Sequence, residues 1–296
     1  QAEDGIRDCL LSRGLGDVYK RQIYDNKKNL VVIMLRGAMD GLTSVPYIND
    51  NTLEKVRTDI FVKKLLKLNS DISLHPKLSS YHKLWNNNEA TIVDATNIPY
   101  TGRSHFDGQN LMESGGKIPY QVKTGWLGRG MKSAGLTGKG LALALPMPLL
   151  IRGVPMNNNY YPVGDRLPSK ETMSIIEQAF KDHDEKLLSE NLKIVMTRDL
   201  RNQGSRENWS LASNAGEELS KHNGPRVAVF EVDGFDTHAA QGATNGAHAD
   251  CLNDFDRIVK GLDQSMSKEA FNNTLIVTLT ESGRTIKQNS SNGTEH

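Results

Sequence analysis

Short apolar runs alternate with longer amphipathic stretches along the chain. Four runs are β-branched or aliphatic and flanked by Gly or polar residues, as buried strands are; they are residues 30–35 (LVVIML), 90–95 (ATIVDA), 227–232 (VAVFEV) and 274–280 (TLIVTLT). A run that is apolar throughout is typical of a parallel sheet covered on both faces. Residues 141–148 (LALALPMP) are a weaker fifth candidate, because prolines interrupt them.

Helical spacing of apolar residues marks the segments between these runs. Residues 79–88 follow a His-Pro pair and are typical of a short helix, and residues 170–190 form a longer amphipathic pattern. In residues 249–266 one stripe carries Leu252, Phe255, Ile258, Val259 and Leu262. Strands that alternate with helices predict an α/β fold, with a mostly parallel central sheet and helices on both faces.

Composition narrows the classes of function. The chain has 296 residues, 37% of them hydrophobic and 24% charged, which suits an ordinary globular protein. The net charge of +1 and the scattered lysines and arginines predict no nucleic-acid partner. Cys9 and Cys251 are the only cysteines, too few for a disulfide framework or a Cys-based zinc site. No apolar run reaches the ~18 residues of a transmembrane helix.

The two ends of the chain differ from its middle. Residues 1–22 mix charge with Gly and lack both a helical stripe and the apolar core of a signal peptide. We expect them to be a non-native or disordered extension; the alternative is a genuine frayed N-terminus. The final NGTEH follows a polar loop with no closing element. We therefore expect residues 23–296 to be one domain that is truncated at its C-terminal end.

Polar side chains follow each of the four strongest predicted strands. In an open parallel sheet, ligands bind beyond the carboxyl ends of the strands, so these side chains should share one edge. In chain order they are Asp40, Ser104 with His105, Asp236 with His238, and Glu281 with Arg284. Carboxylates crowded at one edge repel each other unless they are solvated, protonated or bound to a cation.

This mixture of carboxylates and histidine suits a divalent ion such as zinc, manganese, magnesium or calcium. Asp236 and His238 are two residues apart, so in an extended backbone both side chains point the same way and can reach one ion. A D-x-H pair alone is a common chance pattern, and its place beside other polar strand ends strengthens it. His296 is a further candidate ligand.

Ser104 is a candidate nucleophile. A metal ion would lower the pKa of its hydroxyl, and a helix N-terminus would favour an incoming anion. Arg103 and Arg284 could hold that anion if it is a phosphate or sulfate. However, Ser104 followed by Asp107 is also a helix N-cap signal, so its role stays open. His105 could be a ligand, a base or a packed residue.

The other candidates also have structural interpretations. Asp40 could be a turn residue, Glu281 could cap a following helix, and Arg284 could belong to a structural ion pair. We expect Cys251 to be buried in its helix. Four other histidines are interpreted as structural or solvated; they are His75, His82, His183 and His222.

Six segments of the chain together resemble the DUF1501 family. They are LVVIMLRGAMDGL, SLHPKLSSYHKLW, NIPYTGRSHFDGQNLMESG, GWLGR, AVFEVDGFDTHAAQ and TLIVTLTESGRTIKQNSSNGTEH, in family order from about Leu30 to His296. That family consists of bacterial proteins of undefined function in the alkaline phosphatase-like, sulfatase-related superfamily. The resemblance implies an alkaline phosphatase-like α/β core. It also implies a site of one or two metal ions, where a Ser, Thr or Cys attacks phosphate or sulfate esters.

Carried over by motif, the resemblance places Ser104 near the nucleophile. It implies metal-ligand roles for Asp40, Asp236, His238, Glu281 and His296. The chain departs from the pattern at Ser282, where these relatives usually carry an aromatic residue and phosphatases often a histidine, which argues against a two-zinc site. Relatives are commonly exported through a twin-arginine signal. The resemblance thus implies a periplasmic or exported protein, although the printed chain contains no signal peptide.

The sequence therefore predicts a metal-dependent hydrolase of small anionic phosphate or sulfate esters, with Ser104, His105 and Arg284 as candidate catalytic residues. The alternative is a catalytically inactive exported protein that keeps the fold and binds a metal or ligand. A metal-free serine hydrolase is a weaker third hypothesis, because the chain lacks a G-x-S-x-G nucleophile elbow. Substrate, metal identity, metal count and oligomeric state stay open.

Overall fold

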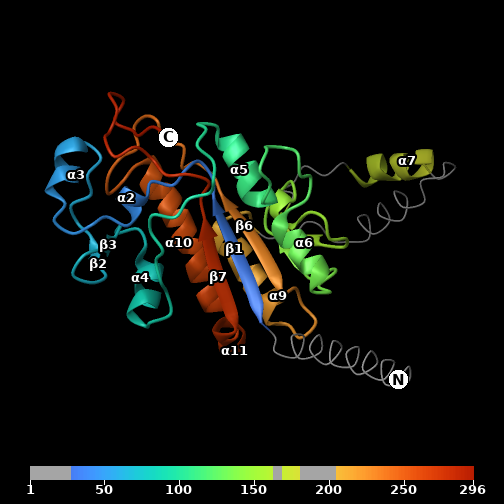
Figure 1. The fold of residues 1–296 in the computed structure, drawn as a ribbon. Helices are drawn as coiled ribbons and strands as arrows, with labels where there is room; N and C mark the ends of the chain where they lie inside the picture. The colour runs from blue at the N-terminus through green and yellow to red at the C-terminus, as the bar shows by residue number, and fades with distance from the viewer. Residues whose placement is uncertain (1–27, 163–168, 181–204) are drawn as a thin grey trace, which may run out of the picture. The chain divides into compact units, whose positions relative to one another are not determined.

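A five-stranded parallel sheet forms the centre of the fold (Figure 1). The computed structural model describes residues 28–162, 169–180 and 205–296. In sheet order the strands are β5 (Asn158–Asn159), β4 (Gly140–Ala142), β6 (Val227–Val232), β1 (Asn29–Leu35) and β7 (Thr274–Leu279). This arrangement confirms the predicted α/β class with a parallel sheet.

The apolar runs form strands where they pair with a neighbouring strand. β1 pairs with β6 on one side and β7 on the other, so that Val31 lies opposite both Ala228 and Ile276. The predictions for 30–35, 227–232 and 274–280 are thus confirmed, and that for 141–148 holds only at its start. β7 is one of the two edge strands and stays half exposed, with Leu275 63% exposed.

The prediction of a strand at residues 90–95 is wrong. This segment has no strand pairing, and Val93 is 73% exposed. A β-branched composition favours a strand only where a partner strand satisfies the backbone and a packed surface covers the side chains. Two tyrosine hydroxyls bind the segment instead. Tyr81 donates to the Thr91 carbonyl, and Tyr47 donates to the Asp94 carboxylate.

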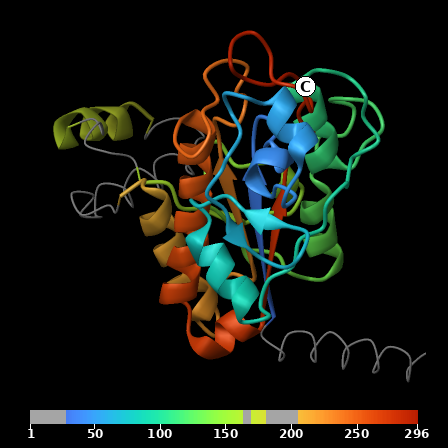
Figure 2. The ribbon, with the colours of Figure 1, turned by 90° about the vertical axis from the view of Figure 1, so that its left-hand side faces the viewer.

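Helices cover both faces of the sheet (Figures 1 and 2). α9 (Asn208–Ser220) and α10 (Ala247–Ser265) pack side by side on one face. α5 (His105–Ser114), α6 (Trp126–Ser133) and the 3-10 turn η1 (Leu149–Ile151) lie on the other. The core on that second face joins β1 and β6 to these helices through Val32, Met34, Val229, Met112, Leu127, Met131 and Ile151.

The predicted stripe of α10 is confirmed, because all five of its apolar residues are buried. Asp256 lies beside this stripe; it is also buried and accepts hydrogen bonds from the backbone N–H groups of Ser80 and Tyr81. These two groups lie in the first turn of α4 (Ser79–Asn86), whose own N-cap residue, Leu78, supplies no side-chain cap. α10 thus caps α4 from outside, at the position where residues 79–88 predict a helix.

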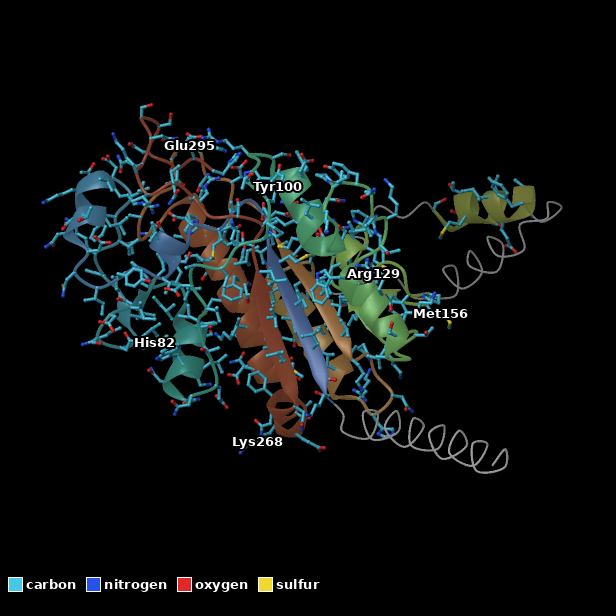
Figure 3. The ribbon with its side chains drawn as sticks, in the orientation of Figure 1. His82, Tyr100, Arg129, Met156, Lys268 and Glu295 are labelled. Atoms are coloured by element: carbon cyan, nitrogen blue, oxygen red, sulfur yellow. The ribbon has the colours of Figure 1, made fainter. Side chains whose placement is uncertain are left out.

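Smaller elements surround the strand ends. α2 (Gly41–Ser44) and α3 (Asn51–Val56) follow β1, and β2 (Leu66–Lys67) pairs antiparallel with β3 (Ser73–Leu74). α11 (Lys268–Asn272) precedes β7. Figure 3 labels Lys268 at one end of the sheet and Tyr100 and Glu295 at the other, which is the end where the parallel strands finish.

The sheet and all of these elements belong to one compact unit, Gln1–Tyr160 with Asn208–His296. Residues Tyr161–Glu207 form a second unit, in which α7 (Lys170–Phe180) is described. Residues 181–190 of the predicted helix, and the predicted extension 1–22, lie outside the described residues. The extent of the single predicted domain stays a prediction. No helix among the described residues has the length and apolar character needed to cross a bilayer.

Candidate metal centre

Three histidines and one aspartate meet beyond the carboxyl ends of the strands. Each of His105, Asp236, His238 and His296 offers one ligand-type atom, and these four atoms lie within 4.8 Å of one another. His105 begins α5, the Asp-x-His pair follows β6, and His296 comes from the segment after β7. Strands and a helix that are distant in the sequence therefore build one group, as the sheet topology predicts.

Two of the histidines face the same carboxylate oxygen. Nε2 of His105 lies 3.0 Å from Oδ1 of Asp236, and Nε2 of His238 lies 2.8 Å from that atom. The first distance suits an ion pair, yet Nε2 of His105 is buried and has no hydrogen-bond partner of acceptable geometry among the described residues. The two atoms are close without being aligned as donor and acceptor.

The other ring nitrogen of His105 and of His238, Nδ1, binds a glutamate carboxylate. Nδ1 of His105 lies 3.0 Å from Oε1 of Glu281, and Nδ1 of His238 lies 2.9 Å from Oε2 of Glu295. An ionised carboxylate only accepts hydrogen bonds, so each Nδ1 carries the proton. In the neutral rings, both Nε2 atoms then carry a lone pair and lie within 3.0 Å of the Asp236 oxygen. Such an arrangement calls for a cation or a further proton between them.

His296 adds a third nitrogen to the group. Its Nε2 donates to the backbone carbonyl of Arg103, so its Nδ1 is left as an acceptor, 3.4 Å from Nη1 of Arg284. The His296 ring centroid lies 4.2 Å from that of His105 and 4.8 Å from that of His238. Burial lowers the pKa of His296, the hydrogen bond to the Arg103 carbonyl opposes this, and the positive charge of Arg284 lowers the pKa further. This favours the neutral ring that a metal ion requires.

Arg284 supplies positive charge beside the group. Its Nη1 donates to Oδ1 of Asp236 at 3.0 Å, and its Nε and Nη2 bind the hydroxyl and carbonyl of Thr294. Desolvation opposes ionisation of Asp236, but the Arg284 hydrogen bond and the two histidines hold its pKa below the usual range. Asp236 is therefore an anion, which is the form in which a carboxylate binds a metal ion.

Two glycines allow the backbones to meet at this point. Gly37 follows β1 with φ +108°, and a Cβ there would lie 2.4 Å from the backbone nitrogen of Asp236. A Cβ on Gly293 would lie 2.4 Å from the carbonyl carbon of His238. Any side chain at either position would push the Asp236–His238 segment away from its neighbours.

Residues 173–296 match the DUF1501 family model. Its description is "Protein of unknown function", and no match was found among curated proteins or solved structures. The match supports the DUF1501 resemblance over that part of the chain. It contains Asp236, His238 and His296, whereas His105 lies before it.

Asp40, expected to be a metal ligand, is not part of the histidine group. Its carboxylate is 1% exposed and accepts hydrogen bonds from Arg57, Thr43 and Gln241. Burial raises the pKa of Asp40, but the ion pair with Arg57 outweighs it and holds the pKa below the usual range. The buried arginine already neutralises this acid.

Glu281, also an expected ligand, lies behind His105. Its Oε1 accepts from Nδ1 of His105, from Nε2 of Gln109 at 2.9 Å and from the backbone N–H of Gly37 at 2.8 Å. The residue is 2% exposed. With three donors on one oxygen, Glu281 supports the histidine and is outside the four-residue group. It does not cap a helix either, because no helix follows β7 in the described chain.

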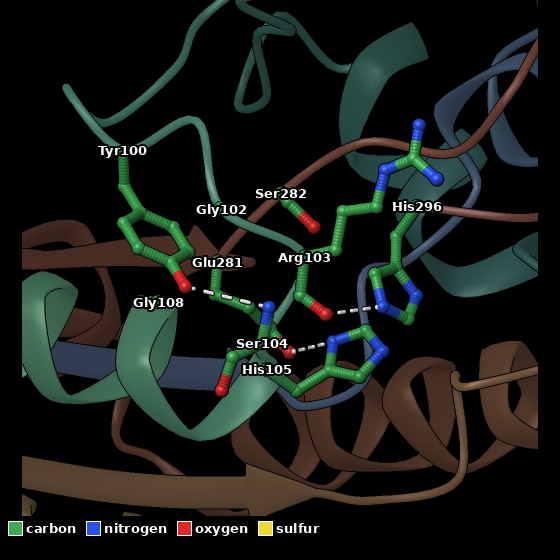
Figure 4. Close-up of a pocket in the computed structure, with 9 residues that line it drawn as sticks. All are labelled: Tyr100, Gly102, Arg103, Ser104, His105, Gly108, Glu281, Ser282 and His296. Atoms are coloured by element: carbon green, nitrogen blue, oxygen red, sulfur yellow. Dashed lines mark hydrogen bonds and ion pairs between the residues drawn. The ribbon is translucent and has the colours of Figure 1, made fainter.

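Ser104, the candidate nucleophile, is the N-cap of α5. Its hydroxyl oxygen accepts from the backbone N–H of Asp107 at 3.3 Å. Figure 4 shows this hydroxyl directed away from the rings of His105 and His296. A small pocket lies here, lined by Tyr100, Gly102, Arg103, Ser104, His105, Gly108, Glu281, Ser282 and His296.

Sequence reasoning missed Gln109 and Glu295. Gln109 lies four residues after His105 on α5, a spacing that places both on one helical face, so the signal was available. Glu295 precedes His296 and reaches His238 across the chain, and nothing local in the sequence predicts that contact.

Proposed function

We propose that this protein binds one divalent transition-metal ion through His105, Asp236, His238 and His296, and that it is a metal-dependent hydrolase of small phosphate or sulfate esters. The observation that carries the metal site is the pair of imidazole Nε2 atoms facing one oxygen of Asp236. Each of these rings has its other nitrogen bound to a glutamate. Carboxylate–histidine pairs of this kind are the usual support of metal-ligating histidines.

The ligand set favours zinc, or another metal that prefers imidazole, over magnesium and calcium. Three nitrogens and one carboxylate oxygen suit zinc, iron, nickel or copper, whereas calcium and magnesium prefer oxygen ligands throughout. Tetrahedral zinc with bonds of about 2.0–2.1 Å has ligand atoms roughly 3.3 Å apart. The two N···O distances of 3.0 and 2.8 Å lie close to that spacing.

The hydrolase assignment rests on the charges around this group. When bound, a divalent ion supplies Lewis-acid activation of water and of an ester oxygen. Arg284 adds a buried guanidinium, whose side chain is 0% exposed, beside Asp236. An anionic phosphate or sulfate ester would meet this charge. Because the Ser104 hydroxyl caps α5, we favour water over Ser104 as the attacking group.

A catalytically inactive metal-binding protein is the second candidate. Four protein ligands complete a tetrahedral shell, and closed shells are typical of structural zinc sites, whereas catalytic sites keep a position open. The N-cap role of Ser104 also favours this candidate. In either case, the alkaline phosphatase-like core and an exported or periplasmic location are part of the proposal through the DUF1501 resemblance.

Metal analysis tests the metal site. Purified protein should carry one equivalent of zinc or a related ion, and Asp236→Ala and His238→Ala should each remove it. His82→Ala is the matched control, because His82 is a histidine away from the group and contacts the Lys67 carbonyl. A wild-type protein that binds none of these metals during equilibrium dialysis would refute the site.

Turnover separates the two candidates. Metal-loaded protein should hydrolyse aryl phosphates or aryl sulfates, and Asp236→Ala should abolish the activity while Ser104→Ala retains most of it. Stoichiometric metal without turnover on a broad ester panel would favour the inactive metal-binding protein.

A further inference from the structure

Gln109 has an orientation that its neighbours determine completely. Its Oε1 accepts from Nη1 of Arg36 at 2.9 Å, and its Nε2 donates to Oε1 of Glu281 at 2.9 Å. A guanidinium can only donate and an ionised carboxylate can only accept, so the amide cannot be turned around without losing both bonds. Gln109 therefore links the Arg36 guanidinium to the Glu281 carboxylate with a single orientation of its amide group.

Arg36 is itself held firmly. Its Nη2 binds Oε1 of Glu113 at 2.8 Å and also pairs with Glu231, and its side chain is 15% exposed. Glu113 lies on the same helix as Gln109, and Glu231 lies in β6. The two acids fix the guanidinium between sheet and helix, which in turn fixes the Gln109 amide.

Glu281 transmits this orientation to the histidine group. Its Oε1 receives Gln109, the Gly37 N–H and Nδ1 of His105, so the carboxylate has no freedom to rotate without breaking three hydrogen bonds. An oxygen with three donors has little capacity left for a metal ion. Its charge favours the His105 tautomer that carries the proton on Nδ1 and presents Nε2 to Asp236.

We propose that Gln109 and Glu281 are positioning residues that act through Nδ1 of His105 and set Nε2 as its metal-binding atom. This inference rests on the proposed metal site and extends it to two residues that touch neither the metal ion nor the substrate. The other supported ring differs, because Glu295 is half exposed, and in the described part of the chain its carboxylate accepts from Asn289 and His238 only. His105 is thus the preorganised ligand of the set.

Gln109→Leu tests the proposal, because it keeps the side-chain volume and removes both amide hydrogen bonds. The affinity for Co²⁺, followed by visible absorption, should fall by about 10- to 100-fold, the usual cost of losing outer support for a ligand. Gln121→Leu is the matched control, since Gln121 is an exposed glutamine after the same helix, and it should bind Co²⁺ as the wild type does. A Gln109→Leu protein with lower thermal stability but unchanged affinity would show a merely structural role and overturn the proposal.

A second measurement needs no metal. ¹⁵N chemical shifts of the His105 ring, recorded at about pH 8 where an ordinary histidine is neutral, report which nitrogen is protonated. The wild type should show the Nδ1–H tautomer, and Gln109→Leu and Glu281→Gln should show a mixture. If the wild type binds no metal, the metal site fails, while these shifts still test the positioning role. Equal tautomer populations in all three proteins would sink the inference.

If Gln109→Leu fails to fold, Glu281→Gln provides the same test. It preserves the shape and can still accept from His105 through its amide oxygen, but it lacks the charge. Its Co²⁺ affinity should fall by about tenfold, the low end of the usual range. Wild-type affinity in this folded variant would also contradict the proposal.

Discussion

Two acids at the same edge of the sheet have opposite surroundings. Asp40, just after β1, is buried against Arg57, and three side chains donate to its carboxylate. Asp236, after β6, is 46% exposed in its side chain, and it meets Arg284 and the Nε2 atoms of two histidines. Both acids follow apolar strands, so their sequence contexts look alike. The difference shows that an acid after a strand does not by itself identify a site, because the groups around it decide what it can bind.

The two regions are nevertheless connected. Gln241 donates to Asp40 through Nε2, and its Oε1 accepts from the Thr294 hydroxyl at 2.7 Å. The same hydroxyl accepts from Nε of Arg284, which binds Asp236. The buried ion pair therefore anchors the segment that carries His296 without contributing a ligand.

Removing the cation from the buried pair should have the largest effect on stability. Arg57→Met leaves the Asp40 carboxylate uncompensated and frees the carbonyls of Thr285 and Ile286, which Arg57 also binds. The free energy of unfolding should drop by about 3–5 kcal/mol, measured by urea denaturation. Lys63→Met is the control, because the Lys63–Glu54 pair is exposed and should change stability by about 0–1 kcal/mol. An equal loss of unfolding free energy in both variants would contradict the stabilising role of the buried Asp40–Arg57 pair.

Replacing each acid by its amide should separate stability from metal binding. Asp40→Asn should cost about 3 kcal/mol of unfolding free energy, because Arg57 stays buried without its counter-charge, yet the folded protein should keep its metal. Asp236→Asn should lose the metal. In metal-free protein it should cost less unfolding free energy than Asp40→Asn, because Asp236 is 46% exposed whereas Asp40 is 1% exposed, even though Arg284 loses its counter-charge. Urea titrations and metal analysis on both variants measure this. Loss of metal in well-folded Asp40→Asn would place Asp40 in the site after all.

The last expected effect is a pH dependence that belongs to the Asp40 side. His248 is buried, binds Ser44, and stacks edge-on against Phe235. Burial lowers the pKa of His248 to about 4, with His75, Arg284 and Arg57 adding to this effect and Asp40 opposing it. The unfolded chain takes up this proton near its ordinary pKa of about 6.5, so the contribution to stability is complete above that pH and is lost as the pH falls toward 4.

The slope of unfolding free energy against pH between about 6.5 and 4 should therefore decrease in His248→Gln. Part of this pH slope should remain in the variant, because burial also lowers the pKa of His75. His222→Gln, at an exposed position, should keep the full wild-type slope. An unchanged slope in His248→Gln would mean that the ring does not stay neutral when folded.

Local patterns predicted the sheet and part of the site. Apolar runs form β1, β6 and β7, and the i, i+2 spacing brings Asp236 and His238 together. The same patterns could not show that Arg57 neutralises Asp40, because a buried ion pair depends on three-dimensional contacts beyond helix α3. They also could not show that residues 90–95 lack a partner strand. Strand propensity and ligand chemistry are local, whereas pairing and charge compensation are set by the whole fold.

Gly293 lies against His238, and the backbone N–H of Thr294 donates to the Thr237 carbonyl. The four proposed ligands come from α5, from the segment after β6 and from the segment after β7, so they meet only after long-range contacts have formed. In kinetic terms, such a centre is assembled late, because non-local loops are closed at an entropic cost before their contacts form. Added metal should then slow unfolding and leave the refolding rate nearly unchanged, because the metal ion would stabilise the native state and not the folding transition state.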